Sequence, residues 1–249
     1  MHRRLHHLGT IGCLASVLAL LDPQMAQGQR VRTYESEIRH PIVELSGPND
    51  VIGPVTGSES YYEPLRIDIG TNVALPHDVA FYGVTAIAIQ EKSDEPCKIE
   101  LYGRLLDPEG SQADILVGKG TLFGCDEERT SSWRAATVAV QPHTFLRSVQ
   151  ACFQKPPFSH MKIKGLTVSS GVVLDDGGIV PLPTMPCFDQ KTPHCFARSH
   201  CNNWAAISVC PVEQIVTGVM LYHYAEDDHP PRALSAIRSL CRSIRIGAG

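Results

Sequence analysis

The sequence predicts an all-β protein in which three similar sheet-forming units close around a shared core and are stapled by disulfides. Three observations predict this class. Short segments alternate apolar and polar residues and are separated by Gly- and Pro-containing turns. A related pattern occurs three times, centred on Gly83, Ser148 and Gly218, which are 65 and 70 residues apart. Eight cysteines follow an N-terminal leader, and an even count in an exported chain is typical of disulfides.

Residues 1–28 have the order of a secretory signal peptide. Basic "MHRRLHH" precedes apolar "LGTIGCLASVLALL" and small-residue "DPQMAQG". The apolar run, residues 8–21, is shorter than the roughly 20 residues that cross a bilayer. Cleavage after Gly28 leaves Gln29 as the new end, and cleavage after Ala26 is the alternative. We therefore expect a secreted protein, extracellular or periplasmic, without a membrane span.

The charge of the mature chain excludes one class of partner. The full chain has 22 basic and 26 acidic residues, and the leader contains two arginines and one aspartate, so 20 basic and 25 acidic residues remain. No basic stripe is left to neutralise phosphates, so nucleic acid is not an expected partner. Residues 29–70 are rich in Pro and Gly and predict an extended lead-in, and residues 71–249 predict one β domain.

The cysteine spacing leaves the disulfide connectivity open. Eight cysteines allow 105 pairings. The short loops Cys187 to Cys195 and Cys201 to Cys210 are the pairs that spacing suggests. A zinc site in "CFDQKTPHCFARSHC" is the alternative, but it lacks the C-x₂-C or H-x₃-H spacing that places two ligands on one turn. Thiols of exported proteins oxidise, so we expect disulfides, no metal and no cofactor.

Most segments after residue 70 predict strands. "KIELYG" (98–103) places Ile99 and Leu101 on one face and Lys98 and Glu100 on the other, and "WRAATVAV" and "MKIKGLTV" are similar. Residues 230–246 are ambiguous, because their apolar residues also fall at helical spacing behind a proline pair. Their position in the repeat favours a strand over residues 232–245.

Three units share this repeat. "FYGVTAI", "FLRSVQA" and "IVTGVML" align on Gly83, Ser148 and Gly218, and each precedes a second strand. The second strands place Leu101, Leu166 and Ile237 at equivalent positions, 17 to 18 residues past the shared valine. A tryptophan, Trp133 or Trp204, precedes the small residue in the last two units. Each sheet alone leaves an apolar face exposed, so three units predict a body with pseudo-threefold symmetry.

The segment 201–244 resembles the vitelline membrane outer layer protein I family. The resemblance comprises a tryptophan, then Cys-Pro, a strand with a Thr-Gly-Val step, an acidic pair and an Ala-Leu-x-x-Ile-x-x-x-Cys close. It is partial over 125–168 and absent before residue 75. The matching residues are Cys210, Pro211, Gly218, Val219, Asp227, Asp228, Ala233, Leu234, Ile237 and Cys241. The resemblance implies a β-prism of three four-stranded antiparallel sheets, stabilised by disulfides. This chain departs from the family in a longer start, a first unit without the tryptophan, and Pro230-Pro231-Arg232 after the acidic pair.

No motif identifies a reaction. The chain has no G-x-S-x-G elbow, H-E-x-x-H pair, Walker loop, dinucleotide fingerprint or D-x-D-x-D-G calcium loop. Three loops carry acidic residues, but turn acids are commonly no more than solvated. These acids are Asp126, Glu127 and Glu128, then Asp175 and Asp176, and finally Glu226, Asp227 and Asp228.

The function that follows by fold-level analogy is non-catalytic. We expect a secreted β-prism protein that binds a glycan or an extracellular matrix component, or contributes to an outer coat. The expected ligand-binding residues are Asp227, Asp228, Asp175, Asp176 and Trp204, with Trp204 either a core residue or a sugar-stacking platform. A carbohydrate-active enzyme that uses two loop carboxylates is one alternative. A secreted protein-interaction module is the other.

Overall fold

The computed structural model describes residues 42–57, 64–92, 95–106, 113–122, 133–154, 163–184, 187, 192–226 and 229–247. The chain separates into two units, Met1–Ile38 and Arg39–Gly249, and every described residue belongs to the second. The predicted leader therefore lies outside the described residues. In the described part, no helix has the length and apolarity to cross a membrane.

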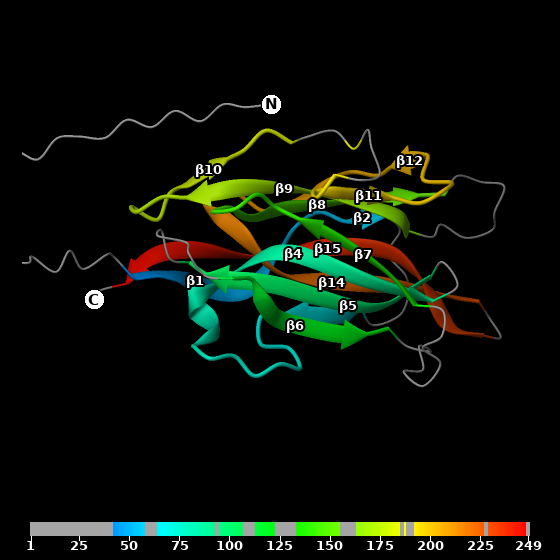
Figure 1. Cartoon of the computed structure of the whole chain (residues 1–249), viewed down its shortest axis with the longest axis horizontal. Helices are drawn as coiled ribbons and strands as arrows, with labels where there is room; N and C mark the ends of the chain where they lie inside the picture. Colours follow the sequence, from blue (N-terminus) through cyan, green and yellow to red (C-terminus); the bar gives the residue numbers. More distant parts are fainter. Residues whose placement is uncertain are drawn as a thin grey trace, which may run out of the picture. The chain divides into compact units, whose positions relative to one another are not determined.

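The second unit is a β-prism of three antiparallel sheets (Figure 1). One 3₁₀ turn, η1 (Val79–Phe81), precedes the second sheet. In sheet A the strand order is β1-β15-β14-β3, and β2 also pairs with β15. In sheet B the order is β6-β5-β4-β7. In sheet C the order is β10-β9-β8-β12, with β11 also paired to β9 and β13 to β8. Sheet A contains β1 (Ile42–Ile52), β2 (Thr56–Gly57), β3 (Leu65–Asp68), β14 (Gln214–Glu226) and β15 (His229–Gly247). Sheet B contains β4 (Tyr82–Lys92), β5 (Glu95–Leu105), β6 (Ile115–Thr121) and β7 (Trp133–Ala139). Sheet C contains β8 (Phe145–Phe153), β9 (Ile163–Val173), β10 (Ile179–Pro181), β11 (Cys195–Ala197), β12 (Asn203–Trp204) and β13 (Ser208–Val209).

The connections between the sheets repeat in a cycle. Each sheet is built on a hairpin, β4-β5, β8-β9 or β14-β15. The strand before each hairpin pairs with the hairpin of another sheet. β7 precedes β8 but pairs with β4. In the same way, β12 and β13 precede β14 but pair with β8, and β3 precedes β4 but pairs with β14. The three sheets are therefore interlocked, which confirms the predicted pseudo-threefold all-β body.

A β-bulge marks the same point in each hairpin. The register shifts at Thr85, Arg147 and Thr217, which each have no paired residue on the neighbouring strand. The carbonyl of each bulged residue accepts a hydrogen bond from the segment that crosses to the next hairpin. The donors are the N–H groups of Val140 (2.9 Å), Cys210 (2.9 Å) and Ile69 (3.1 Å), respectively.

The crossing turns are equivalent as well. Three residues after each donor, the chain adopts a positive φ at a non-glycine residue, namely His143 (62°), Glu213 (65°) and Asn72 (55°). Such values are uncommon outside glycine, so their occurrence at three matched positions supports the symmetry independently of the sheets.

The bulges correct the repeat alignment in the first unit. Ser148 and Gly218 each directly follow a bulge, so their predicted spacing of 70 residues is confirmed. The residue that follows the bulge at Thr85 is Ala86, not Gly83. The second strand differs correspondingly, because Leu166 and Ile237 are equivalent to Ile99 rather than to Leu101. The few shared identities did not reveal this offset of three residues.

The residues predicted to alternate do form strands with buried inner faces. Ile99 and Leu101 are buried in β5, whereas Lys98 is half-buried and pairs with Glu100 (2.8 Å). Apolar residues of all three sheets form one core cluster. Residues 232–245 lie within the strand β15, so the helical alternative is wrong. β14 pairs along one edge of this segment, and β2 and β1 pair with parts of its other edge.

Part of the expected lead-in belongs to sheet A. Ile42–Ile52 pairs along β15, and Leu65–Asp68 pairs along β14. Val43, Leu45 and Ile67 are buried in the core cluster. Alternating apolar residues in "PIVEL" and "LRID" are the sequence signal for these strands.

Gly218 lies where two backbones meet. A Cβ at this position would lie 2.5 Å from the Ile67 carbonyl oxygen and 2.9 Å from the Asp68 Cα. The bulge at Thr217 directly precedes Gly218, so this glycine lies both beside a bulge and at a close backbone approach, the two settings typical of glycine inside a strand.

Three disulfides join described cysteines, and they correct one predicted pair. Cys187–Cys195 is present as predicted. Cys201 bonds to Cys152 and Cys210 bonds to Cys241, so the pair Cys201 to Cys210 is wrong. The reason is that β12 and β13 run along β8, which places Cys201 beside the end of β8 and Cys210 beside β15. Cys97 is also disulfide-bonded, and Cys125 lies outside the described residues. Stable disulfides are typical of oxidising compartments.

Candidate functional site

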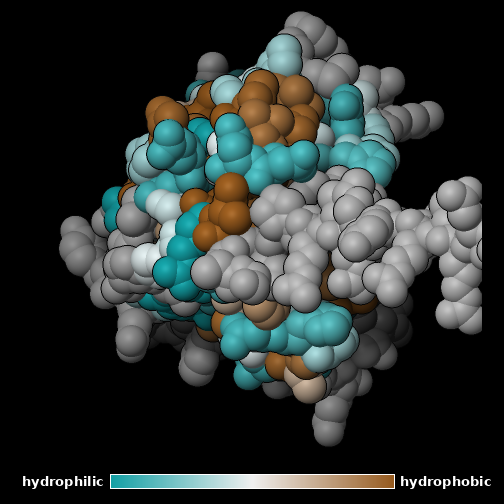
Figure 2. All heavy atoms as spheres, turned by 90° about the vertical axis from the view of Figure 1, so that its left-hand side faces the viewer, coloured by the Kyte–Doolittle hydropathy of each residue, from teal (hydrophilic) through white to brown (hydrophobic). Residues whose placement is uncertain are grey.

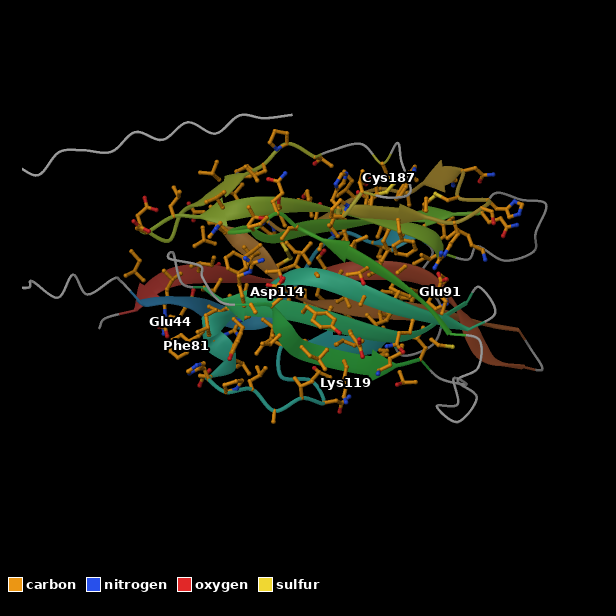
Figure 3. The ribbon with its side chains drawn as sticks, viewed as in Figure 1. Glu44, Phe81, Glu91, Asp114, Lys119 and Cys187 are labelled. Atoms are coloured by element: carbon orange, nitrogen blue, oxygen red, sulfur yellow. A yellow bond between two sulfur atoms is a disulfide. The ribbon has the colours of Figure 1, made fainter. Side chains whose placement is uncertain are left out.

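Most of the described carboxylates form structural ion pairs, and Figure 3 labels three of them. Glu44 pairs with Arg245 (2.8 Å), Glu91 with Arg198 (2.9 Å) and Asp114 with Arg104 (2.9 Å). Glu91 is buried, so the Arg198 guanidinium compensates its charge in the core. The first pair joins β1 to β15, whereas Arg198 directly follows β11 and Asp114 directly precedes β6.

Asp68 is a further buried carboxylate, at the edge of β3. Burial raises the pKa of Asp68, and it outweighs the opposing effects of the Ile69 N–H (2.9 Å) and of the Arg66 and Arg242 guanidinium groups, which lower the pKa. Because it is buried beside Gly218, we assign Asp68 a structural role. In the described part of the chain, no group of three or more His, Cys, Asp or Glu side chains could hold a metal ion.

The predicted ligand residues do not gather at one place. Asp227 and Asp228 lie outside the described residues. Asp175 and Asp176 are exposed in the turn between β9 and β10, where the Asp176 carboxylate accepts a hydrogen bond from the Gly178 N–H (2.8 Å). Trp204 is half-buried and pairs with Cys152 at the other end of sheet C. Phe145 lies near the acidic turn and precedes Cys152 by seven positions in β8. Seven positions correspond to about 23 Å along a strand.

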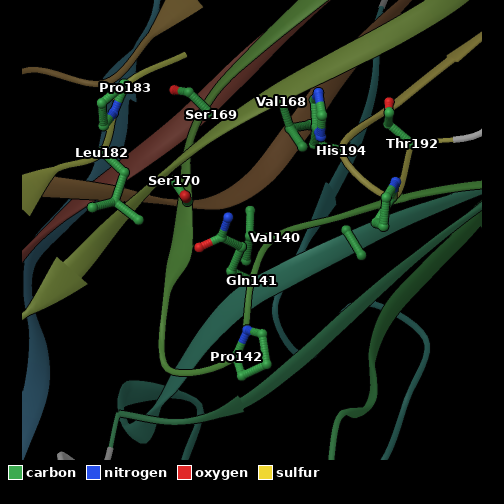
Figure 4. Close-up of a pocket in the computed structure, with 12 residues that line it drawn as sticks. Val140, Gln141, Pro142, Val168, Ser169, Ser170, Leu182, Pro183, Thr192 and His194 are labelled. Carbon is green, nitrogen blue, oxygen red and sulfur yellow. The ribbon is translucent and has the colours of Figure 1, made fainter. Parts of the chain in front are cut away.

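The structure instead contains a hollow where sheet B meets sheet C (Figure 4). We call it the B/C hollow; its volume is about 580 Å³, and twelve residues line it. They come from the end of β7, the turn before β8, the middle of β9, and the segments on either side of residues 185–191. The lining residues are Ala139, Val140, Gln141, Pro142, Val168, Ser169, Ser170, Leu182, Pro183, Thr192, Pro193 and His194.

An interruption of the outer strand of sheet C creates this hollow. β10 covers residues 171–173 of β9 and β11 covers residues 165–167, so neither pairs with residues 168–170 between them. The interruption is anchored on both sides, by a bond from the Val168 N–H to the His194 carbonyl (3.0 Å) and from the Leu182 N–H to the Ser170 carbonyl (2.9 Å).

Close contacts are present at the other two junctions. Between sheets A and B, β3 lies against Gly118 of β6, where a Cβ would meet the Asp68 carbonyl oxygen at 2.5 Å. Between sheets C and A, the Ser239 N–H donates to the Ser208 hydroxyl (2.8 Å) and the Ser239 hydroxyl to the Ser208 carbonyl (2.9 Å).

The B/C hollow has an uncharged lining with a few polar groups. None of its twelve residues is Asp, Glu, Lys or Arg. Gln141 and Ser170 present an amide and a hydroxyl, and no described residue bonds to either group. Ser169 shares its hydroxyl with Ser148 (2.5 Å), and the buried Nε2 of His194 has no hydrogen-bond partner among the described residues. Val168 is buried and forms an apolar wall.

Hydrogen bonds and a neighbouring disulfide hold the wall of the hollow near His194. The Ala139 N–H bonds the Pro193 carbonyl (2.6 Å), and Cys195 forms the disulfide with Cys187. The Thr167 hydroxyl donates to the His194 carbonyl (3.2 Å). These contacts hold residues 192–194 against both sheets. The sequence signal for this site is weak, because it consists of prolines at 142, 183 and 193 in three separate turns.

Exposed apolar side chains also gather at the end of the prism where β10 lies (Figure 2). Val180 of β10 and Leu174 of the preceding turn are 46% and 40% exposed. They flank the acidic turn that contains Asp175 and Asp176. Neither of them lines the B/C hollow.

No family model and no curated protein matches the chain. Solved structures with a similar arrangement include Calystegia sepium agglutinin, at 12% identity and a TM-score of 0.42 over 80% of this chain and 99% of that one. A mannose-specific jacalin-related lectin from Morus nigra, solved with mannose, has 12% identity and a TM-score of 0.39 over 78% and 94% of the two chains. Single-chain recombinant jacalin has 8% identity and a TM-score of 0.38 over 84% and 98%. The β-prism assignment stands on the three interlocked sheets.

Proposed function

We propose that this protein is an exported, non-catalytic β-prism that binds a neutral glycan in the B/C hollow. The observation that carries the proposal is the hollow itself, which combines an uncharged lining with the Gln141 amide and the Ser170 hydroxyl. Its volume of about 580 Å³ is in the range of ligand pockets. Kinship with the vitelline membrane outer layer protein I family is part of this proposal.

The chemistry of the lining fits a neutral sugar. Sugars present hydroxyls at the ring edge and C–H groups on the ring face. The amide of Gln141 offers both a donor and an acceptor, and the hydroxyl of Ser170 can act as either. Pro142 and Leu182 provide apolar contact for C–H groups. An anionic sugar would bring a charge for which the lining offers no Lys or Arg, which is unfavourable.

The sequence-predicted residues enter the proposal as secondary contacts. Asp175 and Asp176 are exposed at the end of sheet C, and we propose that they contact parts of a longer glycan outside the hollow. A role of Asp227 and Asp228 in glycan binding is also part of the proposal. Trp204 lies at the opposite end, so it would require an extended ligand. The disulfides support export, because such bonds persist in oxidising compartments.

Binding to a glycan array and titration calorimetry test the proposal. We expect neutral glycans to bind, and Gln141→Ala with Ser170→Ala to weaken binding at least about tenfold, as loss of two hydrogen bonds implies. The matched control is Thr137→Ala, which changes an exposed residue of β7 outside the hollow and should leave binding within about twofold. Binding lost in Asp175→Asn but retained in the double variant would move the site to the acidic turn. Absence of binding to any neutral glycan contradicts the proposal, and steady release of cleaved sugar supports the enzyme alternative.

A further inference from the structure

The lining of the B/C hollow is more apolar than a sugar ring requires. Seven of its twelve residues are Ala, Val, Leu or Pro, and none is aromatic. Val168 is 3% exposed, and Leu182 and Val140 are half-buried. Ring hydroxyls pressed against this wall would lose their hydrogen bonds to water without gaining partners, which is unfavourable. A ligand of hydroxyls alone therefore leaves most of the wall unused.

We propose that the glycan carries an apolar substituent, an alkyl or aryl group, and that this group fills the apolar wall formed by Val140, Val168 and Leu182. This inference rests on the proposed function, because the sugar portion binds Gln141 and Ser170. The substituent is uncharged, since none of the twelve lining residues is Asp, Glu, Lys or Arg. The ligand is thus amphipathic, with a hydroxyl-rich end and an apolar end.

The geometry of the hollow gives both ends a place. In Figure 4, Gln141 and Pro142 lie across from Ser170 and Leu182, while Val168 lies beside His194. The polar groups are thus next to apolar ones rather than in a separate cavity. A volume of about 580 Å³ is in the range of pockets that bind drug-sized ligands, which are larger than a single sugar ring.

The anchoring of the wall supports a preformed site. Bonds from the Val168 and Leu182 N–H groups fix both sides of the strand interruption, and the Cys187–Cys195 disulfide lies beside His194. An apolar group that enters a preformed pocket does not have to order the chain around it, so more of the burial energy appears as affinity.

Matched glycosides test the inference. The methyl and phenyl glycosides of glucose, galactose and mannose are titrated calorimetrically into the full mature chain. For the sugar that binds, we expect the phenyl glycoside to bind about thirtyfold more tightly than the methyl glycoside, equivalent to about 2 kcal/mol. Leu182→Thr should reduce this ratio to below about fivefold. Val180→Thr, at an exposed position outside the hollow, should preserve the ratio, and circular dichroism checks that both variants fold.

The possible outcomes separate this inference from the proposed function. Equal, measurable affinity for the methyl and phenyl glycosides overturns the inference and leaves glycan binding intact. Benzyl alcohol binding as tightly as all three phenyl glycosides shows that the sugar contributes nothing, which overturns both. Failure of all six glycosides to bind also contradicts both. A ratio that persists in Leu182→Thr but is lost in Val180→Thr moves the apolar contact to the surface of β10 and overturns the assignment to the hollow.

Discussion

Gly218→Ala tests the packing of β3 into sheet A. The added Cβ would lie 2.5 Å from the Ile67 carbonyl oxygen and 2.9 Å from the Asp68 Cα, and backbone atoms cannot rotate away. β3 must therefore move off β14, which weakens the pairing over residues 65–68 and withdraws fully buried Ile67 from the core. Exposing one such side chain costs about 1.5–3 kcal/mol, and each lost hydrogen bond adds about 1 kcal/mol. We expect the free energy of unfolding to fall by about 3–5 kcal/mol.

Urea unfolding of the oxidised protein, followed by tryptophan fluorescence, measures this change. The matched control is Gly178→Ala, where the nearest atom is the terminal carboxylate oxygen of Asp176 in an exposed turn. The control should lose less than about 1 kcal/mol, as is usual for surface substitutions. A Gly218→Ala variant as stable as the control would refute the close approach of β3 to β14.

Three further predictions concern the crosslinks and the buried charges. Replacing Cys210 and Cys241 together by Ser should lower the free energy of unfolding by about 4 kcal/mol, because their disulfide closes a loop with a sequence separation of 31. Denaturant unfolding measures this loss of stability. A loss below about 1 kcal/mol contradicts the pairing. Arg198→Leu should lower the free energy of unfolding by about 3–5 kcal/mol, because it leaves the buried Glu91 carboxylate without its cation. Adding Glu91→Gln should restore part of that loss. A double variant less stable than the single one would exclude this explanation. Since burial raises the pKa of Asp68, the native state binds its proton more readily than the unfolded state, so this group lowers stability as pH rises through its native pKa. Asp68→Asn should therefore stabilise the protein at neutral pH and lose that advantage as pH falls, and an advantage independent of pH would contradict it.

The sequence predicted the sheets better than it predicted their contacts. Period-2 alternation and the three matched segments indicated strands, including β15, because each strand buries one face regardless of its neighbours. The first repeat was misaligned by three residues, since Gly83 resembles Gly218 chemically whereas the structural equivalence depends on the bulge at Thr85. The Cys201–Cys152 pair depends on where β12 lies along β8, which local spacing does not encode.

The candidate site was the least predictable part. Acidic loop residues attract attention in a sequence, but Asp176 supports its own turn and Trp204 lies far from it. The B/C hollow arises because the outer strand of sheet C is interrupted opposite residues 168–170, and its lining comes from four separated segments.

Methyl-resolved NMR is the most direct test of the claim that the hollow is the binding site. Titration of the labelled protein with the phenyl glycosides should shift the methyl signals of Val140, Val168 and Leu182, while those of Val180 at the exposed end of sheet C stay in place. Shifts confined to Val180 and Leu174, or no shift at a saturating concentration, would contradict the account.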